Sequence, residues 1–360
     1  MAELCAFSEV FEGFVFPAAP GEDPARRLRD LAYAGAEARY GELSDSVVER
    51  LDYELDIIGR KGFTDYFLVV AQIAGFTART CGRGSGAASA VAYCLGITNV
   101  DPILHRLYFE RFLNESRPDP PDIDIDFAWD ERDEVIRRAM ETFGQDRSAR
   151  VANHLFFRPR SALREAARAW GMPEGETGAC AAALFEGGEA AAAWEAKELW
   201  REIIPMARRL EGLPQGLSLH CGGLVISPGP IRRRAPLEWS REAYPLLQWE
   251  KDGTEASGLV KIDLLGNRSL AVIRDAVASL LDQGEPDGQL AQEPGWGALV
   301  LEDPETVAML AAGDTMGVFY IESPAMRQLQ KKAGVGDYGH IVIHSSIIRP
   351  AANKFITQYV

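Results

Sequence analysis

The stretch PDIDIDF, residues 121–127, alternates aspartate with apolar residues and decides how the surrounding chain can fold. A strand points successive side chains to opposite faces, so the alternation predicts Asp122, Asp124 and Asp126 on one face and three apolar side chains on the other. Aspartate is a poor strand former, and carboxylates this close raise one another's pKa unless a cation neutralises them. The stretch therefore predicts a divalent metal site on a strand, with an exposed edge strand blunted by charge as the alternative.

The composition is that of a globular protein with two or three compact units. The 360 residues are 47% hydrophobic and 25% charged, and no apolar run approaches the roughly 20 residues of a membrane span. The N-terminus carries acidic residues where a secretory signal would be basic. No C-x-x-C pair occurs among the five cysteines, so we expect a reducing cytoplasm without a disulfide framework or zinc ribbon: Cys5, Cys81, Cys94, Cys180 and Cys221.

The net charge of −15 argues on average against a nucleic-acid partner, since phosphate binding normally needs a basic excess. Positive charge is nevertheless concentrated locally, most densely at Arg232, Arg233 and Arg234. Such a cluster can face a polyanion, or it can be an ordinary solvated surface.

A second acidic candidate is Asp263 in GLVKIDLLG, where a lone carboxylate stands among apolar neighbours. An unpaired carboxylate there would cost several kcal/mol, so something must satisfy it. Metal binding from a strand beside PDIDIDF would do so. A hydrogen bond to a backbone amide or a salt bridge to Lys261 would serve equally well.

The segment GRGSGAASAVAYCLG predicts a glycine turn that enters a helix. Arg83 adds a guanidinium, Ser85 a hydroxyl, and the free amides of the helix N-terminus would point into the same turn, which suits a phosphate. The segment lacks the G-K-[ST] ending of a Walker loop. A plain glycine turn is the alternative.

Periodicity places a small helical subdomain at 161–210, with β-branched strands returning near HCGGLVISPGPI. The apolar run FTDYFLVVAQIAGF fits either a helix or a strand. The β-branched filling of HIVIH predicts a strand, which argues against a zinc site at His340 and His344. His220 is predicted to be a packed or hydrogen-bonded histidine.

With these motifs in order, the chain resembles the alpha subunit of bacterial DNA polymerase III, one of the C-family DNA polymerases. The matching segments keep the family's order over nearly the whole chain: DIIGRKGFTDYFLVV, GRGSGAASAVAYCLGITNVDPI, LYFERFLNESRPDPPDIDIDF, HCGGLVISPGPI, GLVKIDLLGNRSL and DTMGVFYIESPAMRQL. YIESPAMR and HSSIIRPAANK are more similar to the error-prone, damage-associated branch than to the replicative subunit, so the resemblance implies a role in DNA replication, DNA repair or translesion synthesis, with the choice between the two branches left open.

The resemblance implies specific roles for residues of these motifs. Two magnesium ions, or manganese in their place, would be held by three catalytic aspartates: Asp124, Asp126 and Asp263. Asp122 would then be structural. The loop that contacts the nucleotide triphosphate corresponds to Arg83, Gly84 and Ser85. The candidate DNA-binding residues are six arginines: Arg158, Arg160, Arg164, Arg232, Arg233 and Arg234.

The resemblance also implies the fold and the domains. We expect an α/β (α+β) fold with a palm like that of polymerase beta, in which helices back a mixed sheet. The palm would comprise residues 1–153 and 220–267, split by a helical thumb at 154–219, and residues 268–360 would begin the helical fingers. A fragment is expected, since no PHP domain precedes FVFP and the later fingers do not follow.

The implied reaction is attack by a primer 3′-hydroxyl on the alpha phosphate of a deoxynucleotide. The expected partners are primer–template DNA, deoxynucleotides and other replisome or translesion subunits, in the bacterial cytoplasm at the nucleoid and not at a membrane. Two alternatives remain open. One is a truncated, inactive module of the same fold that binds DNA or protein, and the other is a nucleotidyltransferase that copies no template.

Overall fold

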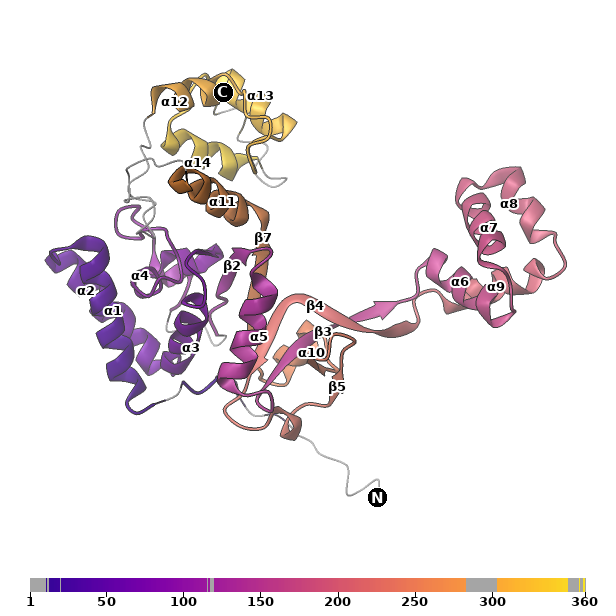
Figure 1. The fold of residues 1–360 in the computed structure, drawn as a ribbon, viewed down its shortest axis with the longest axis horizontal. Helices are drawn as coiled ribbons and strands as arrows, with labels where there is room; N and C mark the ends of the chain where they lie inside the picture. The colour runs from indigo at the N-terminus through magenta and orange to yellow at the C-terminus, as the bar shows by residue number, and fades with distance from the viewer. Residues whose placement is uncertain are drawn as a thin grey trace. The chain divides into compact units, whose positions relative to one another are not determined.

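The computed structural model describes residues 11, 13–19, 21–114, 116, 120–282, 303–348, 356 and 359. Contacts within the chain divide it into two units, Met1–Gly266 and Asn267–Val360. The first unit contains the sheet and the second is helical in its described part (Figure 1).

A seven-stranded sheet organises the first unit, in the order β1-β2-β7-β4-β3-β6-β5. The strands β3 and β6 run parallel, whereas β1 with β2, β3 with β4, β4 with β7 and β5 with β6 run antiparallel. The α/β fold with a mixed sheet is therefore confirmed. The strand bounds are β1 (Thr80–Arg83), β2 (Asp124–Ala128), β3 (Ser148–Phe156), β4 (Pro214–Ile226), β5 (Leu237–Trp239), β6 (Pro245–Leu247) and β7 (Lys261–Asn267).

Short and long helices accompany these strands. They are α1 (Pro24–Tyr40), α2 (Asp45–Arg60), α3 (Thr64–Ala74), α4 (Ala90–Cys94), α5 (Arg132–Phe143) and α10 (Lys251–Ala256), with 3₁₀ turns η2 (Gly84–Ala88), η3 (Phe109–Arg111) and η4 (Ile231–Arg233). The apolar run that periodicity could not assign is α3, and it is buried along most of its length. A long apolar segment that is covered on all sides leaves no polar face from which to read its period.

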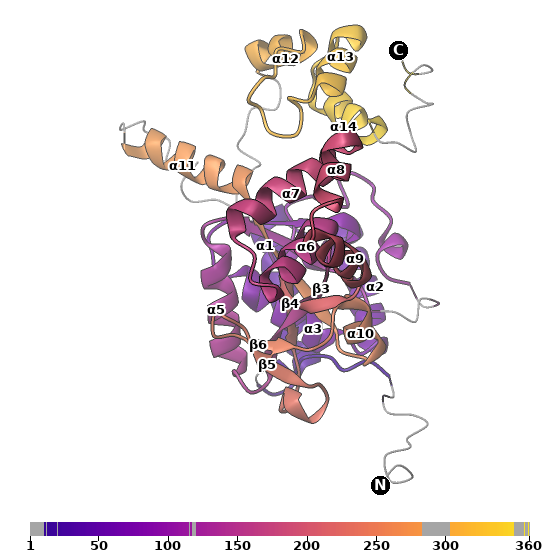
Figure 2. The ribbon, with the colours of Figure 1, turned by 90° about the vertical axis from the view of Figure 1, so that its right-hand side faces the viewer.

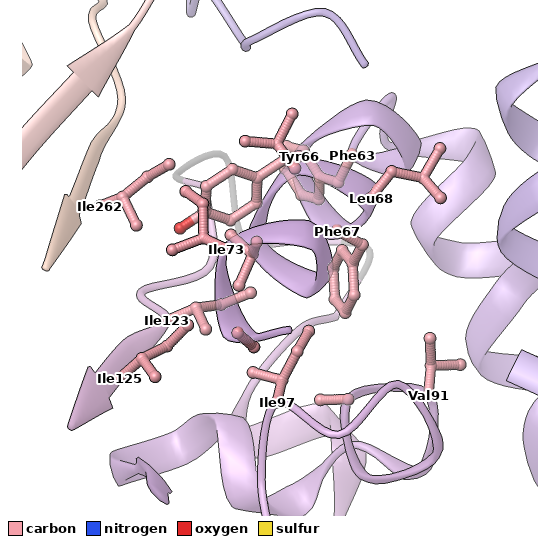
Figure 3. Packing of buried hydrophobic residues seen from close by; sticks show 14 of the residues in the cluster. Phe63, Tyr66, Phe67, Leu68, Ile73, Val91, Ile97, Ile123, Ile125 and Ile262 are labelled. Carbon is pink, nitrogen blue, oxygen red and sulfur yellow. The ribbon is translucent and has the colours of Figure 1, made fainter. Parts of the chain in front are cut away.

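The apolar half of PDIDIDF packs against α3. Ile123 is 2% exposed, and Ile125 and Phe127 are fully buried, as the alternation predicted. Figure 3 shows Ile123 and Ile125 in one cluster with Tyr66 and Phe67 of α3. The strand itself begins only at Asp124, so Asp122 precedes it and is exposed.

Four helices follow β3 and precede β4, and they have a core of their own around the buried Trp200. They are α6 (Pro159–Ala169), α7 (Glu174–Glu186), α8 (Gly188–Glu195) and α9 (Trp200–Leu210), and they pack on one another in both views (Figures 1 and 2). The helical periods of the sequence predicted this subdomain. The flanking residues are strand, because β3 continues to Phe156 and β4 begins at Pro214.

The described part of the second unit consists of α11 (Arg268–Asp282), α12 (Pro304–Ala311), α13 (Pro324–Ala333) and α14 (Tyr338–Ile347). The predicted strand at HIVIH is wrong, because this segment lies within α14. Asp337 caps that helix by accepting a hydrogen bond from the His340 amide. Part of the expected fingers, residues 283–302 and most of 349–360, lies outside the described residues. Among the helices described, none combines the length and apolar character that a bilayer crossing requires.

Candidate functional site

Two neighbouring strands bring acidic side chains together. Asp124 lies on β2 and Asp263 on β7, strands that are adjacent in the sheet. Carboxylate oxygens of Asp122, Asp124 and Asp263 all lie within 4.8 Å of one another. Burial raises the pKa of Asp124, and the negative charges of Asp122 and Asp263 raise it further. Such a group is stabilised by a divalent cation, and its oxygen ligands suit magnesium or manganese.

The acidic group differs from the predicted set in one member. Asp122, expected to be structural, takes part, whereas Asp126 is not among the three. Asp126 lies on the same face of β2 as Asp124, and both contact one arginine: Nε of Arg83 is 3.6 Å from Oδ1 of Asp126 and 3.7 Å from Oδ2 of Asp124. The alternation could not reveal this, because it treats the three aspartates as equivalent.

Asp263 has one satisfied oxygen and one that is not. Nζ of Lys261, two residues earlier on β7, donates a hydrogen bond to Oδ2 of Asp263. This is the salt bridge that the sequence offered as an alternative to metal binding. Oδ1 of Asp263, however, is buried and has no hydrogen-bond partner among the described residues. A buried orphan acceptor beside two further carboxylates fits a cation, so the lysine contact does not account for the whole arrangement.

Nδ1 of His220 lies 3.8 Å from Oδ1 of Asp263, but the two side chains do not form an ion pair. That nitrogen accepts hydrogen bonds from the amides of Gly222, at 3.3 Å, and Gly223, at 2.8 Å, so it carries a lone pair and not a proton. Burial lowers the pKa of His220, which also favours the neutral ring. His220 is therefore a hydrogen-bonded histidine, as the sequence predicted.

Arg83 and the glycine loop lie directly beside the acidic strand. The β1–β2 ladder pairs Arg83 with Asp124, and Nε of Arg83 is 3.7 Å from Oδ2 of Asp124. After this residue the chain turns through Gly84, whose φ of +71° favours glycine, into η2. Arg83, Gly84 and Ser85 are all exposed. The structure thus brings the predicted loop and the acidic strand to one edge of the sheet.

One part of the phosphate prediction is wrong. The helix that follows the loop, α4, does not offer its N-terminal amides to a ligand, because the carboxylate of Glu54 accepts hydrogen bonds from Ala90 and Val91. The exposed residues at the start of η2, Gly84 and Ser85, and the Arg83 side chain remain for an anion. Sequence reasoning missed Glu54, which comes from α2, more than 30 residues earlier.

The six candidate arginines lie in two groups, and all of them are exposed. Arg158 is the N-cap of α6, and Arg160 and Arg164 lie within this helix. The guanidinium of Arg160 lies 5.2 Å from the ring centre of Phe185. Arg232, Arg233 and Arg234 are in or next to η4. Exposure is compatible with a polyanion partner and with a solvated surface alike.

Comparisons with known proteins match almost the entire chain. Residues 26–266 match the family model described as the bacterial DNA polymerase III alpha NTPase domain, and residues 269–360 match the finger domain of the same subunit. The chain is 36% identical to the error-prone DNA polymerase of Nocardia farcinica over 93% of its length and 29% of that protein. It is 38% identical to the error-prone DNA polymerase of Alkalilimnicola ehrlichii, over 97% of the chain and 35% of that protein. It is also 38% identical to the error-prone DNA polymerase of Mycobacterium tuberculosis, over 90% of the chain and 29% of that protein. The chain thus spans about a third of the length of these relatives.

Proposed function

Because the chain belongs to the bacterial DNA polymerase III alpha family, we propose that it is the catalytic core of a template-directed DNA polymerase. It would transfer a nucleotide from a deoxynucleoside triphosphate to a primer 3′-hydroxyl. One observation carries the proposal: carboxylates from two adjacent strands converge within 4.8 Å, next to an exposed arginine and a glycine turn. Adjacent acidic and cationic groups are what a metal-bound triphosphate requires.

The proposed metal ligands are Asp124, Asp126 and Asp263. Asp124 and Asp263 already converge, and the buried orphan oxygen of Asp263 faces no other partner in the described residues. Asp126 shares the face of Asp124, and Asp122 adds a fourth carboxylate to the cluster. Two magnesium ions bound there would lower the pKa of the attacking hydroxyl and stabilise charge on the phosphates.

The chain's own residues would orient the nucleotide. Arg83 lies within 3.7 Å of both aspartates of β2, so an anion held by its guanidinium stays beside the acidic cluster. Gly84 and Ser85 can add backbone amides and a hydroxyl to the same phosphates. We assign these three residues to nucleotide binding.

The wider assignments follow from the relatives, which are named error-prone DNA polymerases. We propose primer–template DNA and deoxynucleotides as substrates, with a role in translesion synthesis and repair in the bacterial cytoplasm. The six exposed arginines are the proposed DNA contacts, and further translesion subunits are proposed partners. We propose that residues 1–153 and 220–267 form the palm. Residues 154–219 would form the thumb, and residues 268–360 would begin the fingers.

Metal binding and primer extension test the proposal together. Asp124→Asn and Asp263→Asn should each weaken Mn²⁺ binding, measured by electron paramagnetic resonance, by about tenfold or more, since even outer-shell partners are worth about 10–100-fold. Extension of a primed template with magnesium should fall by about 100-fold or more. Asp30→Asn is the control, because that side chain is 68% exposed on α1.

Two further variants decide the third ligand. Asp126→Asn should impair Mn²⁺ binding and extension more than Asp122→Asn does. The reverse order would indicate that Asp122, and not Asp126, is the third metal ligand. Equal extension by all variants, or none by any protein including the wild type, would favour a non-catalytic binding module, and extension that ignores the template would favour a different nucleotidyltransferase.

A further inference from the structure

Glu54 is a fully buried acid in the apolar stripe of α2. The stripe runs through Leu51 and Ile58, one turn to either side, and Glu54 replaces the apolar side chain expected between them. A carboxylate in such a position costs several kcal/mol unless donors surround it. Burial raises the pKa of Glu54, and hydrogen bonds from Ala90, Arg50 and Val91 oppose that increase.

Four donors surround the carboxylate, two to each oxygen. Oε1 accepts from Nε of Arg50 at 2.6 Å and from the Ala90 amide at 2.9 Å. Oε2 accepts from Oγ of Ser89 at 2.7 Å and from the Val91 amide at 3.1 Å. A set that includes a guanidinium and two amides matches a charged carboxylate, which only accepts hydrogen bonds.

The same cluster clamps the chain that leaves the glycine loop. The guanidinium of Arg50 also donates to the carbonyl of Ala88 at 2.9 Å, so α2 holds residues 88–91 through both side chains. The hydroxyl of Ser89 in turn caps α4 by accepting from Ala92 at 3.1 Å. Two hydrogen bonds link this cluster to η2: the one from Arg50 to Ala88, the last residue of η2, and one from the Ser89 amide to the Gly86 carbonyl at 3.1 Å.

The exposed loop is therefore fixed at both ends. On one side the β1–β2 ladder pairs Arg83 with Asp124. On the other side, the Glu54 clamp begins at Ala88, so only four residues lie between the two anchors. A buried ion pair is weak evidence for stability, since an apolar residue could fill the same space, and its best-attested use is to specify one arrangement.

We infer, on the basis of the proposed function, that Glu54 is a positioning residue for the nucleotide: through Ser89 and the start of α4 it holds Gly84 and Ser85 where they can contact a triphosphate. Glu54 itself does not touch the nucleotide. The carboxylate takes the amides that a helix N-terminus would otherwise present, so the anion is directed to the loop and not to α4.

Two affinities test this inference. Isothermal titration calorimetry measures the affinity of the chain for dATP with Mg²⁺, and electron paramagnetic resonance measures its affinity for Mn²⁺. Glu54→Gln keeps the shape but places an amide group against donors, so dATP affinity should fall by about tenfold, the size of one charged hydrogen bond. Mn²⁺ affinity should change by less than about twofold, because the metal ligands lie on other elements. A merely structural defect would not separate the two ligands.

Two variants make the result decisive. Ser89→Ala removes one of the four donors to Glu54 and takes the place of Glu54→Gln if that variant does not fold. It should weaken dATP binding, but by less than Glu54→Gln does. The control is Glu176→Gln in α7, whose carboxylate accepts a hydrogen bond from Nε1 of Trp200 at 2.9 Å. This substitution should leave dATP binding unchanged. Wild-type affinity in a folded Glu54→Gln protein, or an equal loss in the control, would overturn the inference. Absence of dATP binding by the wild type would instead remove the proposed nucleotide site, and the positioning role with it.

Discussion

Gly223 stands opposite Asp263 in the β4–β7 ladder, and its missing side chain lets neighbouring side chains approach its backbone closely. A Cβ at this position would lie 2.9 Å from Cβ of Val151 and 3.0 Å from Nδ1 of His220. Val151 on β3 belongs to a buried core cluster, and Nδ1 of His220 lies 3.8 Å from Asp263. Gly223 is therefore required because neighbouring side chains approach the backbone closely, and not because the chain turns there.

Gly223→Ala should lower the free energy of unfolding by about 1–3 kcal/mol, because an extra methyl group in a packed site forces its neighbours to move. Urea denaturation measures the change. Gly216→Ala is the matched control on the same strand, since no atom lies within 4 Å of the added Cβ, and it should change the free energy by less than about 0.5 kcal/mol. Equal effects of the two substitutions would contradict the steric explanation.

Helix α14 forms where local propensity favours a strand, and it begins at a capping residue. Its sequence YGHIVIHSSI is rich in β-branched residues, which favour a strand. Asp337 nevertheless starts a helix, since Oδ1 accepts from the His340 amide and Oδ2 contacts the His340 ring. The hydrogen bond from the His340 amide lowers the pKa of Asp337 below its usual value of 3.8.

This pKa shift fixes the sign of a pH effect. A carboxyl group whose pKa is lower in the folded state stabilises the fold above the unfolded pKa, and that contribution is lost as the pH falls through the folded value. The difference in thermal midpoint between the wild type and Asp337→Asn should thus be present at pH 6 and shrink as the pH falls below 3.8. Asp314→Asn, at an exposed position between α12 and α13, should show no such trend. A difference that grows on acidification would refute the explanation.

The elements also show how far the sequence alone could be read. The alternation in PDIDIDF predicted the buried face of β2, because strand geometry dictates it. It could not tell Asp122 from Asp126, because the start of the strand at Asp124 and the approach of Arg83 depend on partners distant in sequence. Glu54 was missed for the same reason: its donors at 89–91 meet it only in the folded chain.

For the whole molecule, the charge of −15 must be reconciled with the polyanionic substrate that we propose. A distributed negative charge repels DNA at long range, but salt screens it beyond about 10 Å, so local arginines decide contact. The contacts that we propose are the exposed arginines of α6 and of η4. Both groups belong to the first unit, Met1–Gly266.

Alanine at Arg232, Arg233 and Arg234 should weaken binding to primed duplex DNA. It should also reduce the slope of log affinity against log salt by up to about 3, since each phosphate that an arginine neutralises adds about one to that slope. Fluorescence anisotropy over a series of salt concentrations measures the slope. The matched control replaces Arg137, Arg168 and Arg208, each of which is ion-paired with a glutamate. An unchanged slope in the first variant would exclude the η4 cluster as a DNA-binding surface.

The strands β3 and β4 remain paired up to the point where the four helices begin, with Phe156 opposite Pro214 and the Phe157 amide bonded to the Leu213 carbonyl. The helical lobe thus enters and leaves through two backbones about 5 Å apart, the spacing of any two bonded strands. A gene could gain, enlarge or exchange such a lobe in one in-frame event and leave the carboxylate-bearing strands undisturbed. Within this architecture, the four helices can evolve at a different pace from the strands that carry the carboxylates.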